Sequence, residues 1–138
     1  MKRCRILTVT LVLAAAAAGC GGMRQAAERA RAVNDLKQLG LLYQQYNDMN
    51  RKGPDRVEDL EPLADPQSRP VLQAVKAGKY VLIWGVKAGD LGKVPGGSGA
   101  AVLGYEKDVP SAGGPVLFGD MSVKVVTADE FKAAPRAK

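Results

Sequence analysis

Apolar side chains recur at intervals of three and four residues from about residue 23 to residue 50, and polar side chains fill most positions between them. This spacing places the apolar side chains on one face of a long α-helix. We expect the helix to end at Lys52-Gly53-Pro54, because glycine accepts a left-handed cap and proline cannot continue a helix. The apolar positions are Ala26, Ala30, Val33, Leu36, Leu39, Tyr43, Tyr46 and Met49.

Two shorter helical segments are predicted next. Residues 55–63 carry valine and leucine at helical spacing, which indicates a short helical turn. Asp65-Pro66 is typical of a helix start, so we expect a second helix from there to Lys76, where Gly78 stops it.

After residue 78 the pattern changes to short runs rich in β-branched and aromatic residues. We predict strands at 79–86, 100–105, 115–118 and 122–126, with the last two forming a hairpin. The glycine-rich stretch 88–99 predicts a loop, and Thr127 is expected to cap a final helical turn. The predicted fold class is α+β, with a long N-terminal helix and short helices packed on a small antiparallel sheet.

The first twenty residues have the pattern of an export signal. Three basic residues precede the uncharged residues 6–19, a run shorter than the roughly 20 residues that a membrane-spanning helix needs. The run closes with Ala17-Ala18-Gly19-Cys20, which resembles the lipobox of bacterial lipoproteins. The resemblance implies cleavage before Cys20, diacylglycerol on its sulfur and a fatty acid such as palmitate on the new N-terminus. An ordinary cleaved signal that leaves Cys20 as a free thiol stays open as the alternative.

These patterns divide the chain into four parts. Residues 1–19 are predicted to be a lipoprotein signal peptide, and residues 20–22 a short flexible tether to the lipid. Residues 23–131 form one globular domain, and residues 132–138 a polar, basic tail. The predicted location is the bacterial cell envelope, on the outer membrane or the periplasmic face of the inner membrane.

Composition and charge exclude several classes of function. The chain has 138 residues, a net charge of +6 and no histidine, which excludes Ser-His-Asp and Cys-His catalysis and histidine metal sites. Residues 1–19 hold three basic and no acidic side chains, so their removal leaves a charge of +3. That excess is not gathered in a dense basic patch, and we expect no nucleic-acid partner.

No hydroxyl, thiol or carboxylate stands in a recognisable catalytic arrangement, so we predict a protein that is not an enzyme and needs no cofactor. Carboxylates are the only plausible metal ligands. Asp90, Asp108 and Asp120 lie in or beside loops near the sheet and are weak candidates for a calcium site, because the Asp-x-Asp-x-Asp-Gly spacing is absent.

The globular part resembles a known bacterial family. The stretch from Asn34 to Leu41, followed by Tyr46 and Gly53-Pro54, is similar to a motif of type II secretion pseudopilin G-like proteins, a prepilin-type group. Residues 57–60, 80–85, 103–106 and 116–123 resemble the segments that follow in that group, so the likeness covers about residues 32–131. It implies a pseudopilin-like domain.

The chain departs from that family at its signature positions. The family carries a histidine ten residues before the aspartate of an Asp-Gly pair, with nine residues between them; this chain has Pro110, Asp120 and Met121 at these positions. Prepilins retain an apolar helix with a glutamate at its fifth position, where this chain has Ala27 and would lose its apolar run on cleavage. The resemblance therefore implies a pseudopilin-type domain moved onto a lipid anchor.

The predicted function is that of a membrane-anchored, non-enzymatic lipoprotein, a structural or interaction module at the cell envelope. Its expected partners are the membrane, through the lipid on Cys20, and envelope polymers. The predicted contact surface is the sheet edge near Trp84, the loop 88–99 or the terminal hairpin. The alternative is an accessory component of a type II secretion or type IV pilus system that binds pseudopilins through the helix Val33–Met49.

Overall fold

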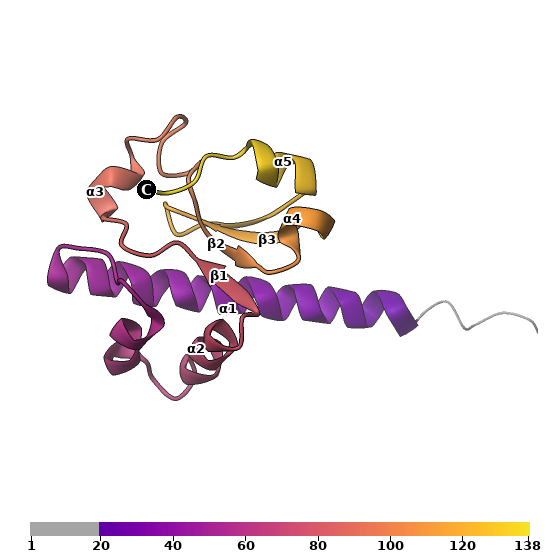
Figure 1. Cartoon of the computed structure of the whole chain (residues 1–138). Helices are drawn as coiled ribbons and strands as arrows, with labels where there is room; N and C mark the ends of the chain where they lie inside the picture. Colours follow the sequence, from indigo (N-terminus) through magenta and orange to yellow (C-terminus); the bar gives the residue numbers. More distant parts are fainter. Residues whose placement is uncertain (1–19) are drawn as a thin grey trace, which may run out of the picture.

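The protein folds as an α+β domain, which confirms the predicted fold class. The structure is a computed structural model that describes residues 20–138, so the predicted signal peptide at residues 1–19 lies outside the described residues. Figure 1 shows the long helix α1, Cys20–Asn50, with the sheet on one side and the short helices η1, Val57–Leu63, and α2, Arg69–Lys76, on the other.

The middle of helix α1 packs in the core. Ala32, Leu36, Leu39 and Tyr43 have no exposed surface, because they pack between the sheet and the short helices. Residues 21–31 are all exposed. The predicted apolar face was therefore right at Leu36, Leu39 and Tyr43 and wrong at both ends, where Ala26, Ala30 and Met49 are exposed.

Both ends of α1 differ from the prediction. Residues 20–22 are already part of α1 and not a flexible tether; a glycine in a helix costs about 1 kcal/mol but does not break it. The left-handed residue after the helix is Arg51, with φ 57°, and not Gly53. Gly53 is needed there for another reason, because its Cα lies against the backbone of Gly85 and Val86.

The two short helices close the core on the far side of α1. Leu60 of η1 and Leu72 of α2 are buried against it. The second helix starts at Arg69 and not at Asp65, because the Asp65 carboxylate accepts hydrogen bonds from the backbone N–H groups of Gln67 and Ser68 and holds a turn.

The sheet has four antiparallel strands in the order β1-β2-β3-β4. The strands are β1, Tyr80–Leu82; β2, Val102–Glu106; β3, Gly114–Phe118; and β4, Val123–Val126. Strand β3 is buried along its whole length, because α1 covers one face of the sheet and the helices α4, Val109–Ala112, and α5, Ala128–Ala133, cover the other. The predicted hairpin of β3 and β4 is confirmed.

Three boundaries in the second half were predicted wrongly. The strand predicted at 79–86 ends at Leu82, because the chain then turns toward α1, with Gly85 at φ 73°. The predicted loop 88–99 begins with a helical turn, α3, Ala88–Leu91. The segment 132–138, predicted as a polar, basic tail outside the domain, packs against it: Ala137 is buried and Val102 exchanges two backbone hydrogen bonds with residues 135 and 137.

Thr127 caps α5 as expected. Its hydroxyl accepts a hydrogen bond from the Glu130 backbone N–H, and the Glu130 carboxylate accepts one from the Thr127 backbone N–H, which is a reciprocal capping box. These hydrogen bonds hold the pKa of Glu130 below its usual value. The capped helix brings Phe131 onto the outer face of the sheet, edge-on to Tyr105.

Candidate functional site

The free edge of strand β1 is the most developed candidate for a binding surface. The Ile83 N–H donates to the Leu103 carbonyl and the Lys107 N–H donates to the Lys79 carbonyl. In an antiparallel ladder the bonded residues alternate, so the backbone groups of Tyr80 and Leu82 point away from β2. An added strand pairs with outward N–H and C=O groups of this kind; Tyr80 and Leu82 themselves are 2% and 5% exposed.

A groove of about 330 Å³ runs beside this edge, and we call it the edge groove. Its apolar lining includes Val81, which is 37% exposed, and the partly buried Trp84. Arg56 and Glu58 add one charge of each sign. The groove therefore offers strand hydrogen bonds together with an aromatic side chain and both charges. The full lining is Arg56, Val57, Glu58, Val75, Tyr80, Val81, Leu82 and Trp84.

Two side chains of α1 fix the chain that follows β1. The Tyr43 hydroxyl donates to the Ile83 carbonyl at 3.0 Å and accepts from the Val86 N–H at 3.0 Å. The Asn47 amide oxygen accepts from the Ala88 N–H at 3.3 Å. Because these bonds lie on both sides of Trp84, they hold it at the end of the edge groove. Sequence reasoning missed Asn47, which is 5% exposed, because it reads as a polar surface residue of a helix.

The buried Tyr43 hydroxyl makes the stability of the fold depend on pH. Burial raises the pKa of Tyr43 to about 12, above its ordinary value of 10.0. The unfolded chain would release this proton near the ordinary value, so the stability linked to the protonated hydroxyl is complete below that pH and is lost as the pH rises through about 12. Burial, and a hydrogen bond donated to Asp35, raise the pKa of Tyr80 in the same direction.

We therefore expect the free energy of unfolding to fall as the pH rises above the ordinary tyrosine pKa. Tyr43→Phe should remove part of this slope, and the remainder is due to Tyr80 and to Lys52 and Lys76, whose pKa values are also raised. Denaturant unfolding over an alkaline pH series measures both chains. An identical slope in Tyr43→Phe would contradict the assignment of a buried, protonated hydroxyl at this position.

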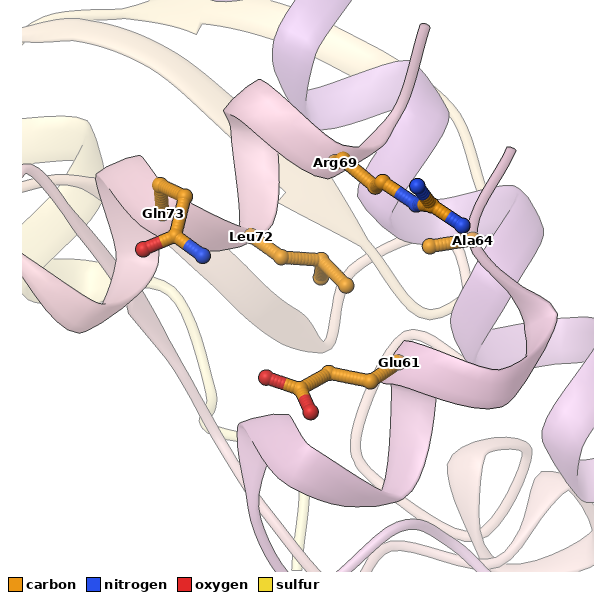
Figure 2. Close-up of a pocket in the computed structure, with 5 residues that line it drawn as sticks. All are labelled: Glu61, Ala64, Arg69, Leu72 and Gln73. Atoms are coloured by element: carbon orange, nitrogen blue, oxygen red, sulfur yellow. The ribbon is translucent and has the colours of Figure 1, made fainter. Parts of the chain in front are cut away.

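A second hollow, of about 280 Å³, lies between η1 and α2. Figure 2 shows the side chains of Glu61, Leu72 and Gln73 around it, with Arg69 beside Ala64. The Lys76 ammonium pairs with Glu61 and, at 3.7 Å, with Glu58. This pairing is the largest cause of the raised pKa of Lys76, and it ties the two helices together. Of the two charged side chains that line the hollow, Glu61 already pairs with Lys76, and the hollow's chemistry is less distinctive than that of the edge groove.

The three weak calcium candidates do not converge. Asp90 pairs with Lys93, which lowers the pKa of Asp90, and Asp108 precedes α4. Partial burial raises the pKa of Asp120, but hydrogen bonds from Ser122 outweigh it and lower the pKa overall. Within residues 20–138, no three acidic, cysteine or histidine side chains gather closely enough to hold a metal ion.

The predicted lipidation residue, Cys20, is the first residue of α1. Between residues 20 and 138, none of the helices has the length and apolar character of a bilayer-spanning segment.

No protein-family model matches the chain, and neither the curated proteins nor the solved structures contain a significant match to it. The likeness to pseudopilins therefore rests on the sequence motifs given above and stays a prediction.

Proposed function

We propose that the protein is a lipid-anchored, non-enzymatic interaction module of the bacterial cell envelope, which binds an extended segment of a partner protein in the edge groove. The observation that carries this proposal is the outward orientation of the Tyr80 and Leu82 backbone groups beside a partly apolar groove. An extended peptide can satisfy those groups with main-chain hydrogen bonds and place its side chains against Val81 and Trp84.

The anchor is the second part of the proposal. Lipid on Cys20 would hold the body close to the membrane, because α1 continues without interruption from Cys20 into the core. The acyl chains supply about 0.8 kcal/mol for each buried methylene, and more than one chain is needed for stable attachment.

Replacing Cys20 tests the anchor. Cys20→Ala should move the protein from the membrane fraction to the soluble fraction and abolish incorporation of labelled fatty acid, while Gly21→Ala, at the next helical position, should leave both unchanged. The measurement is fractionation of cells grown with labelled palmitate. A wild-type chain that takes up no label, or a Cys20→Ala chain that stays in the membrane fraction, would contradict the anchor.

The alternative function is an accessory component of a type II secretion or type IV pilus system that binds pseudopilins through Val33–Met49. In this stretch Leu36, Leu39 and Tyr43 pack in the protein's own core, whereas Leu41 and Met49 are 64% and 65% exposed. A contact with pseudopilins would therefore use Leu41 and Met49. Leu41→Glu combined with Met49→Glu should abolish crosslinking to pseudopilins if this alternative holds.

A further inference from the structure

The first three turns of α1 direct polar side chains toward the body and apolar side chains to solvent. A groove of about 240 Å³ separates this part of the helix from the end of β2 and from α4, and its α1 lining is polar: Gln25, Glu28 and Arg29. On an α-helix of about 3.6 residues per turn, Met23, Ala27 and Ala30 lie on the opposite side. An amphipathic helix usually turns its apolar side to its own core, and this one turns it to solvent.

The apolar side continues along the helix. Met23 is 79% exposed, and Leu41 is 64% exposed. Their 18-residue separation is about five full turns, so the two side chains point in the same direction. The core residues Leu36 and Tyr43 lie on the other side of α1. We call the side formed by Met23, Ala27, Ala30, Asn34 and Leu41 the outer face of α1.

Basic side chains border the outer face. Arg24 and Arg31 lie along one border and Lys37 along the other, and all three are exposed. Between Met23 and Leu41 the acidic residues lie elsewhere; the next one, Asp48, is exposed and follows Ala30 by 18 residues, so the outer face ends before it. Glu28 lines the groove toward the body, and Asp35 accepts a hydrogen bond from the Tyr80 hydroxyl at 2.6 Å. The outer face therefore combines exposed apolar side chains with positive charge.

We propose that the outer face of α1 lies on the anionic phospholipid surface of the membrane that holds the protein. This inference rests on the proposed lipid anchor, because Met23 follows Cys20 by three residues, about 4.5 Å of helix rise, and so would stay at the bilayer surface. Met23 and the alanines enter the boundary between head groups and acyl chains. The arginines and the lysine extend sideways to the phosphates, as in other helices that lie in a membrane interface.

The consequence is a fixed orientation of the body. A helix that stood upright on its lipid would leave the outer face in water and let the body tilt freely. A helix that lies along the surface turns the core side of α1, and with it the sheet, away from the bilayer.

The test places an environment-sensitive fluorophore at one of two positions of the same helical turn. Met23→Cys lies on the outer face, and Gln25→Cys faces the body and serves as the matched control. Each full chain is expressed in cells, purified with its lipid, labelled, and reconstituted into vesicles of phosphatidylglycerol and phosphatidylethanolamine or of phosphatidylcholine alone. We expect a blue shift of the emission at position 23 in the anionic vesicles, a smaller one in the neutral vesicles, and none at position 25.

Charge reversal tests the basic border. Arg31→Glu with Lys37→Glu should abolish the shift at position 23, whereas Lys87→Glu with Lys107→Glu, an equal charge change at exposed positions elsewhere, should leave it intact. Equal, water-like emission at positions 23 and 25 would overturn the inference and indicate an upright helix. So would a shift that survives reversal of Arg31 and Lys37.

Mass measurement of the Cys20 peptide separates this inference from the proposed function. A lipidated peptide with no shift at position 23 leaves the anchor standing and refutes the orientation. If the peptide carries no lipid, the anchor fails. The two labelled chains are then added to the vesicles from solution, where a shift at position 23 alone supports the membrane contact and its absence refutes it.

Discussion

Replacing Gly53 with alanine is expected to lower the free energy of unfolding by about 3 kcal/mol, the largest loss for a single added methyl group in this fold. A Cβ at Gly53 would lie 2.2 Å from the Val86 carbonyl oxygen, 2.5 Å from the Val86 nitrogen and 2.8 Å from the Gly85 carbonyl carbon. All three atoms belong to the backbone, so no side chain can rotate to make room. The chain after α1 would have to separate from the segment that carries Trp84.

Gly89 provides the matched control for this substitution. It lies in α3, and an added Cβ would meet no atom within 4 Å. Gly89→Ala should therefore be neutral or stabilise the protein by up to about 1 kcal/mol, because alanine loses less backbone entropy on folding. Denaturant unfolding followed by the fluorescence of Trp84, the single tryptophan, measures both variants. Equal stability of the two variants would show that Gly53 does not pack against residues 85 and 86.

Replacing Val81 with glutamate is expected to abolish binding of the partner while leaving the fold intact. The side chain is exposed, so the substitution costs little stability, but it places a second negative charge beside Glu58 in the edge groove. A bound strand would have to desolvate that charge, and the one cation in the lining of the groove, Arg56, already pairs with Asp59. We expect co-purification of the partner with the lipidated protein to fall at least tenfold, the loss that about 1.4 kcal/mol produces.

Val125 is the matched control, because it is an exposed valine, 58% accessible, on a strand of the same sheet. Val125→Glu should retain the partner, since it lies on β4, at the other edge of the sheet from β1. Loss of the partner in Val125→Glu with retention in Val81→Glu would move the contact surface to the terminal hairpin, which the sequence also offered as a candidate.

The order of the elements was predictable because local signals in the sequence agree with the packing. Leu36, Leu39 and Tyr43 recur at helical spacing and are buried, and the Gly119-Asp120-Met121 turn joins two short runs, 115–118 and 122–126, that pair as expected. Thr127 and Glu130 stand three residues apart, and this spacing alone predicts their capping box.

The errors fall where contacts distant in sequence decide the backbone. Strand β1 is short because Tyr43 and Asn47, about forty residues earlier, bond residues 83–88 and draw them away from the sheet. Gly53 has the composition of a helix cap, but its role is a close approach to Val86 that no local pattern reveals. Ala26 and Ala30 stand at three- and four-residue intervals in the same apolar run, yet Ala30 lies on the side of α1 opposite Leu36 and Tyr43, and both alanines are exposed.

The candidate site was predictable only in part. The sheet edge near Trp84 was one of three contact surfaces that the sequence suggested, and the structure places Trp84 in the lining of the edge groove. The outward direction of the Tyr80 and Leu82 backbone groups depends on the register with β2, which the sequence does not specify when both strands are short. The sequence also did not reveal that the apolar side of residues 23–31 faces solvent, because this depends on where the body lies relative to α1.

The most direct test of a lipid-anchored module with a binding edge is photocrosslinking in intact cells. A photoreactive amino acid is placed at position 81 or, as control, at position 125, in the wild-type chain and in Cys20→Ala. We expect a discrete crosslinked species at position 81 of the chain with Cys20, and its loss both at position 125 and in Cys20→Ala. Crosslinks at position 125 alone, or equal crosslinking at position 81 with and without Cys20, would contradict the proposed function.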